Sequence, residues 1–383
     1  MTLTNRKNST FSQEGKAELI SLFKQIIILA AIGLIVMLLT NGKPPAVVVG
    51  LSFCLIAFFV ARSEHKRLLQ KSQVTSQTNN LSAATLNDAD LSDAEINQLS
   101  VHQDLLQKLV YQVSEEQLSK AHFLLANLSN ANLNNINLDD VYFSGTNLSN
   151  AQLVNASFLN GNFCGANLSN VNLSNANLSN ANLTSANLSN ANLSNTQLVD
   201  ANLSSANLNN AHLVGANLSH ANLSDANLNN ANLNNANLSG VYLWNGNFND
   251  AQLIGTNFSS AYMNSAKLKN ANLSSADLKN AKLSDAKLKD ANLSNADLRG
   301  ADLSSANLKN TNFSDANFKD ANLCGANLED ANLNNADLRN ADLSNANLNN
   351  VKVEKTRFGW NQGISEEMKV ELKLIGAIFE GNG

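Results

Sequence analysis

The side chains best able to do chemistry in this chain are five histidines and three cysteines. The histidines show none of the spacings that metal-binding motifs require; they are His65, His102, His122, His212 and His220. The cysteines are too few and too scattered for a disulfide framework. We expect free thiols at all three, which are Cys54, Cys164 and Cys324. The sequence therefore predicts neither a metal site nor a cofactor.

Motifs that hold phosphates or build nucleophilic sites are missing as well. We find no glycine-rich phosphate loop, no nucleophile elbow and no constrained pair of carboxylates in the sequence. The formal net charge of −5 is mild, and only 15% of the residues are charged, so composition does not indicate a nucleic-acid partner. We expect a protein that is not an enzyme and that binds neither nucleic acid nor a small-molecule substrate.

A five-residue hydrophobic period dominates the chain instead. From Phe123 to Leu348 every fifth position is Leu, Phe or Met, and Val353 and Phe358 extend the series. Two residues before each of these stands Ala or another small-to-medium residue. Five residues advance about 140° around an α-helix, so the leucines would define no helical face. On one long strand they would alternate between faces.

The period makes physical sense if each pentad is a short extended edge followed by a corner. In Ala176-Asn177-Leu178 the two apolar side chains point the same way and the Asn points outward. The next pair in each pentad is rich in Ser, Asn, Asp and Gly, which are turn residues. Stacked edges would bury Leu203 and its equivalents, while corner residues such as Ser204 are expected to face solvent.

Tandem A(N/D)LXX repeats resemble the pentapeptide-repeat family, and the resemblance covers residues 121 to 350. It implies an all-β fold: a right-handed quadrilateral β-helix with four pentads in each coil and about 12 coils. Coils of that length would place Phe123, Phe143 and Phe163 directly above one another inside. Asn at the outward central positions would form long amide ladders.

Two apolar segments precede the repeats, at residues 19–40 and 46–62. Each approaches the roughly 20 residues that span a bilayer, and we predict a transmembrane helical hairpin over residues 19–62. A re-entrant hairpin and a secretory signal peptide are the alternatives. Most of the nearby Lys and Arg residues flank the hairpin on both sides, which predicts that both termini and the repeats are cytoplasmic.

The remaining segments are assigned by their pattern. Residues 1–18 form an amino-terminal cytoplasmic tail, 63–80 a linker and 121–358 the predicted β-helix. Residues 81–120 contain a partial coil followed by apolar residues at helical spacing. We interpret them as a helical amino-terminal cap, with a membrane-surface helix as the alternative.

Residues 359–383 are expected to form a helical carboxyl-terminal cap. Ser365 is a suitable N-cap, acidic residues follow it, and Gly376 stands where the helix should end. The apolar face of this helix would consist of Met368, Leu372 and Ile375.

Tyr242, Trp244 and Tyr262 are the best candidates for a specific contact. They interrupt a surface of Asn and Ser at positions that a coil of four pentads brings together. An exposed aromatic cluster on a rigid polar wall is typical of an interaction hot spot. Harmless local variation is the alternative.

A second candidate surface is a basic ladder that recurs once per predicted coil. Its members are Lys279, Arg299, Lys319 and Arg339. Such a ladder could bind an anionic partner. Pairing with nearby acids is the favoured interpretation; these acids are Asp277, Asp297, Asp320 and Asp337.

These features predict a membrane-anchored scaffold or adaptor that contacts the lipid bilayer through residues 19–62 and presents a rigid rod to an unidentified protein partner. A regulator of a specific membrane transporter or enzyme complex is the alternative. The tethered type resembles family members abundant in cyanobacteria, which implies a plasma or thylakoid membrane. Some family members shield gyrase as strongly negative DNA mimics, but that function is disfavoured here. Between residues 121 and 266 the only acids are Asp139, Asp140, Asp200, Asp225 and Asp250.

Overall fold

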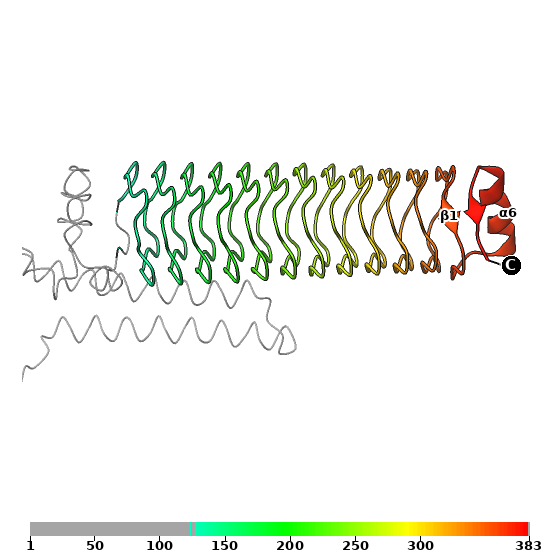
Figure 1. Ribbon diagram of the computed structural model, residues 1–383, viewed down its shortest axis with the longest axis horizontal. Helices are drawn as coiled ribbons and strands as arrows, with labels where there is room; N and C mark the ends of the chain where they lie inside the picture. The colour runs from blue at the N-terminus through cyan, green and yellow to red at the C-terminus, as the bar shows by residue number, and fades with distance from the viewer. Residues whose placement is uncertain (1–122, 124–126, 382–383) are drawn as a thin grey trace, which may run out of the picture. The chain divides into compact units, whose positions relative to one another are not determined.

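The computed structural model describes residue 123 and residues 127–381. In Figure 1 residues 127–381 form a row of flattened coils, from cyan at the start of the row to red at the carboxyl-terminal helix. Within these described residues, no helix is long and apolar enough to cross a bilayer. The segments 1–18, 19–62, 63–80 and 81–120, whose structures were predicted above, lie outside the described residues.

Parallel backbone pairing at a constant offset of 20 residues joins each coil to the next. The bridges begin with Asn127↔Asn147, recur at every fifth residue and end with Asp342↔Gln362. Along the edges, backbone groups bond to the coils on either side. For example, the Asn177 N–H donates to the Ala156 carbonyl one way, at 2.9 Å, and the Leu178 N–H donates the other way. Because 20 residues are four pentads, the predicted four-sided β-helix is confirmed.

Each corner is a β-turn whose third residue has a left-handed backbone. After Leu178, the leucine carbonyl accepts from the Ala181 N–H at 3.0 Å, and Asn180 has a φ of 58°. Gly adopts this conformation at no steric cost, and Asn and Asp tolerate it better than other residues. The requirement for positive φ therefore explains why Asn, Asp and Gly occupy most of the last positions of the pentads.

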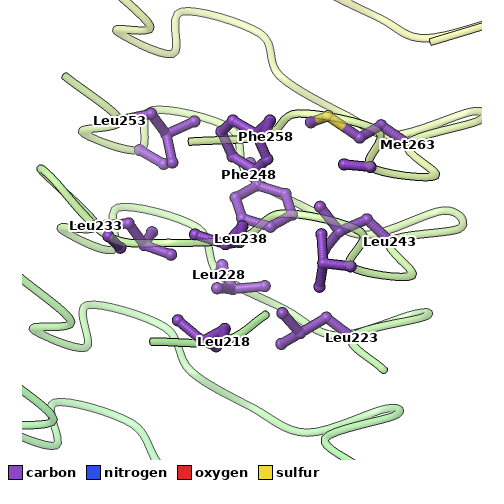
Figure 2. Packing of buried hydrophobic residues seen from close by; sticks show 14 of the residues in the cluster. Leu218, Leu223, Leu228, Leu233, Leu238, Leu243, Phe248, Leu253, Phe258 and Met263 are labelled. Atoms are coloured by element: carbon purple, nitrogen blue, oxygen red, sulfur yellow. The ribbon is translucent and has the colours of Figure 1, made fainter. Parts of the chain in front are cut away.

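The interior is a stack of one large and one small side chain from each pentad, and nearly all of them are apolar. The exceptions are buried threonines such as Thr196, whose hydroxyl donates to the Leu173 carbonyl at 2.8 Å. Figure 2 shows leucines of successive coils lying above one another, with Phe258 and Met263 continuing the columns of Leu238 and Leu243. Leu203 is fully buried, as predicted. The stack of Phe123, Phe143 and Phe163 is also confirmed, with neighbouring ring centroids 5.1 and 5.0 Å apart.

Asparagine at the central position of an edge has two hydrogen-bonding roles. The Asn187 Oδ1 accepts from the Ser189 N–H at 3.2 Å, which stabilises the following turn. The Asn187 Nδ2 donates to the Asn167 Oδ1 one coil earlier, at 3.3 Å. This confirms the predicted amide ladders. One ladder runs without a break through Asn127, Asn147, Asn167, Asn187, Asn207, Asn227 and Asn247.

The carboxyl-terminal cap contains β1 (Arg357–Phe358), α6 (Glu366–Leu374) and β2 (Ile378–Phe379). Helix α6 begins as predicted, because the Ser365 side chain accepts from the Met368 N–H at 3.2 Å. Strand β2 pairs in parallel with β1 and adds a further rung, which the sequence analysis missed. Ala377-Ile378-Phe379 does carry the small-x-aromatic pattern of a pentad, and that signal could have revealed it.

Three expectations about individual side chains are wrong. Ile375 is 53% exposed, because it is the C-cap of α6 and its non-helical backbone removes it from the face of the buried Leu372. Ser204 is only 6% exposed; corner side chains of adjacent coils stack, and its hydroxyl lies 3.5 Å from that of Thr184. Cys164 is disulfide-bonded instead of free, whereas Cys324 is a free, half-buried thiol.

Candidate functional site: surfaces for a partner

The aromatic cluster, formed by Tyr242, Trp244 and Tyr262, lies on the outer wall of two successive coils. Tyr242 and Tyr262 are bridged in register, and their rings stack with centroids 5.0 Å apart and planes within 5° of parallel. Trp244 is 62% exposed at the corner that follows Tyr242, and the two tyrosines are 47% and 43% exposed. The structure therefore brings together the three aromatic residues that the sequence singled out.

The interior behind the aromatic cluster is complete without it. Val241, Leu243 and Met263 are fully buried and occupy the inward positions of the same pentads. Gly246, the next small position, is explained by the core, because a Cβ there would lie 3.1 Å from the Phe248 ring. The exposed aromatic rings thus fill no space that the core needs.

The basic ladder is largely neutralised by acids on the same face. The Lys279 Nζ lies 2.9 Å from Asp277, and the Arg299 guanidinium forms a two-nitrogen contact with Asp297 at 2.6 and 2.8 Å. Exposed pairs of this kind typically contribute about 0–1 kcal/mol. Lys319 is exposed and has no ion pair among the described residues, because its coil has Asn317 where the other three coils of the ladder have Asp. Asp320, which was expected to pair, instead accepts from Asn340.

Arg339, the last member of the ladder, fastens the carboxyl-terminal cap. Its guanidinium donates to Asp337 at 2.8 Å and to Glu380 at 3.0 Å, and Arg357 also donates to Glu380, at 2.7 Å. Hydrogen bonding by Arg339 lowers the pKa of Asp337, and hydrogen bonding by Arg357 lowers the pKa of Glu380. This end of the ladder therefore has a structural role.

A second group of lysines escaped the sequence analysis. The lysine patch, as we define it, lies on two successive coils and two adjoining faces, beside the aromatic cluster. Its recognition requires the coil length, because its members are not evenly spaced in sequence. They are Lys267, Lys269, Lys282, Lys287 and Lys289.

Exposed apolar side chains at the cap were also missed. Val370 and Leu374, one turn apart on α6, are 58% and 81% exposed.

Among the described residues, no group of His, Cys, Asp and Glu side chains could hold a metal ion. The exposed groups on the described walls are aromatic rings, amides and ammonium groups, which can bind a partner.

A family model described as pentapeptide repeats matches most of the repeat region. The matched residues are 121–160, 162–196, 196–235, 236–274, 276–315 and 316–354. The chain belongs to the pentapeptide-repeat family. No curated protein matches the chain.

Several solved structures are similar to this pentapeptide-repeat protein. HetL, a pentapeptide repeat protein involved in heterocyst differentiation regulation from the cyanobacterium Nostoc sp., is 30% identical; 61% of this chain and 90% of HetL are covered, with a TM-score of 0.25. Rfr23 from the cyanobacterium Cyanothece is 37% identical, over 24% of this chain and 59% of that one, with a TM-score of 0.16. QnrB1, a plasmid-mediated fluoroquinolone resistance protein, is 16% identical, over 48% and 99%, with a TM-score of 0.35.

Proposed function

We propose that this pentapeptide-repeat protein is a non-enzymatic scaffold or adaptor that binds a protein partner through the side wall of its β-helix. The aromatic cluster is the observation that carries the proposal. Its two stacked tyrosines and neighbouring tryptophan stand on a wall whose backbone is bonded to both adjacent coils. Such a wall changes little on binding, so little ordering entropy opposes a contact there.

Exposure of the aromatic rings has a cost that a partner would remove. Trp244 is 62% exposed although the inward positions of its pentad are already filled. Apolar rings on a polar surface lower solubility unless a contact covers them. Tyr and Trp are also the residues most enriched among those that dominate binding energy.

The proposal includes a membrane anchor at residues 19–62, with the repeats in the cytoplasm of a plasma or thylakoid membrane. Two apolar segments and the cations that flank them support it. The full-length protein should then resist extraction by alkaline carbonate, and deletion of residues 1–75 should release a soluble rod. Extraction of the full-length protein by carbonate would exclude an integral anchor.

Regulation of one specific membrane transporter or enzyme complex is the second candidate. HetL, which is 30% identical, is described as involved in the regulation of heterocyst differentiation. A regulatory role for this chain would likewise operate by binding. Purification in mild detergent separates the two candidates, because a regulator should retain one stoichiometric membrane partner, whereas a general scaffold should retain several.

The experiment that tests the scaffold function is affinity purification of the full-length chain followed by mass spectrometry. The variant Tyr242→Asn, Trp244→Ser, Tyr262→Asn restores the repeat consensus and should reduce the captured partner by about tenfold or more. Tyr142→Asn is the matched control, because Tyr142 is 44% exposed at the same position of a distant coil. Equal capture by the triple variant and the wild type would refute a role for the cluster.

A further inference from the structure

The lysine patch adjoins the aromatic cluster in the register of the coils. Lys267 and Lys287 are bridged to each other, and Lys282 is bridged to Tyr262 of the cluster. Lys269, Lys282 and Lys287 are exposed, and the other two lysines of the patch are half-buried. Five ammonium groups therefore belong to two successive coils, with a stacked tyrosine pair beside them.

Counter-charges that serve other cations of the rod are missing from this patch. Among the described residues, only Lys289 of the patch has an ion pair, with Asp290 at 3.9 Å. Asp250 and Asp285 lie at nearby corners, but Asp250 instead accepts from the Asn270 amide. Elsewhere on the same rod each of four cations has a carboxylate within 3.0 Å; these cations are Lys279, Lys309, Arg299 and Arg339.

Two of the lysines stand where the repeat would place ladder asparagines. The amide ladder that begins at Asn127 reaches Asn247, where Lys267 and Lys287 follow in the same column. An amide bond of this column reappears only between Asn327 and Asn347. Lysine at these positions therefore gives up amide bonds and sets two like charges in register, which is unfavourable in a sheet. Stability of the rod does not explain the lysines.

We propose that the lysine patch is the docking surface for an acidic, extended segment of a partner protein. The proposal rests on the scaffold function above and specifies the chemistry of the partner. Alternate carboxylates of an extended peptide lie about 6.6 Å apart and bridged residues of adjacent coils about 4.8 Å apart, so the long side chains of Lys267 and Lys287 can reach two such carboxylates. A single-stranded nucleic acid fits less well, because the stacking of Tyr242 on Tyr262 already occupies one face of each ring on which a base would stack.

Fluorescence anisotropy of a labelled acidic peptide tests the proposal. The probe is a peptide of alternating Glu and Ser, titrated with the full-length protein in non-ionic detergent. Lys267→Asn/Lys287→Asn should weaken binding at least about fivefold, and added salt should weaken binding to the wild type. The matched control is Lys319→Asn/Lys352→Asn, which removes the same charge from two exposed lysines that have no ion pair in the described part of the rod. The control should bind as the wild type does.

Four outcomes would overturn the proposal. One is equal loss of peptide binding in both double variants, which would reduce the effect to net charge. Another is unchanged binding by Lys267→Asn/Lys287→Asn, whose thermal unfolding should show an intact rod because the consensus amides are restored. The third is tighter binding of a single-stranded oligonucleotide of the same charge through the same lysines. The fourth is capture of the cellular partner by Lys267→Asn/Lys287→Asn but not by the triple aromatic variant. That result would refute this inference and leave the proposed scaffold function supported.

Discussion

Phe379 stacks on Phe358 with the ring centroids 5.0 Å apart and the ring planes 14° from parallel. Phe379 thus occupies the place of the next core residue, although β2 pairs with β1 one residue later than the repeat offset requires. Lys369 and Lys373 of α6 lie over its other side, 5.8 and 5.6 Å from the ring centroid. The cap therefore ends the rod with one further strand, β2, which pairs with β1, and helix α6 covers that strand.

Phe379→Ala should open this cap without unfolding the rod. Because the ring is only partly buried, we expect a loss of about 1–3 kcal/mol, less than is typical for a fully buried Phe. The amides of Ile378 and Glu380, which donate to the Thr356 and Phe358 carbonyls, should then exchange hydrogen faster. Ile378→Ala is the control, since that side chain is 46% exposed. Similar exchange in the two variants would contradict the proposed packing role.

Acidification should loosen the same cap. Arg339 lowers the pKa of Asp337, and Arg357 lowers that of Glu380. A carboxyl with a lowered folded pKa stabilises the fold above its unfolded pKa, and this contribution disappears as the pH falls through the folded value. Protection of the β2 amides, measured as the exchange rate relative to the intrinsic rate at the same pH, should therefore fall below about pH 4.5. Glu380→Gln should show lower protection of these amides already at neutral pH and a smaller loss of protection in acid; an unchanged acid-induced loss would refute the link.

The leucine columns should respond to substitution far more strongly than the outer wall. Leu203→Ala should cost about 2–5 kcal/mol through lost transfer energy and a cavity. Leu203→Asp should cost more, since it buries an unpaired carboxylate. His212→Asn, on an exposed wall two pentads further along the chain, should change stability by less than about 0.5 kcal/mol. Urea unfolding followed by circular dichroism measures these differences, and comparable losses at 203 and 212 would contradict the inward assignment of Leu203.

The left-handed corners should discriminate between Gly and Ala. Asn230 has a φ of 57°, and its side chain forms no hydrogen bond with the residues that the structure describes. Asn230→Ala should cost about 1 kcal/mol, because a Cβ without a compensating polar group disfavours this conformation. Asn230→Gly should be close to neutral, because Gly adopts positive φ freely. A rod that tolerates Ala as well as Gly at this position would show that the corner is not conformationally demanding.

The sequence alone determined the backbone of the repeats. A five-residue period with a small and a large apolar residue two apart permits one short edge and one corner per pentad, and the structure has both. The Phe123–Phe143–Phe163 stack and the amide ladders also followed, once the family resemblance supplied four pentads per coil. Local pattern suffices here because each pentad repeats the same short-range choices of side-chain direction and turn residue.

Contacts between coils were decided only by the tertiary structure. Neighbours on the wall are 20 residues apart in sequence, and whether a cation meets a carboxylate depends on side-chain reach across that gap. The sequence therefore pointed to the basic ladder, three of whose members have carboxylate partners. It missed the lysine patch, where four of five lysines have no ion pair with any residue that the structure describes. Strand β2 was missed for a related reason: its one-residue shift breaks the period, and only pairing with β1 restores the register.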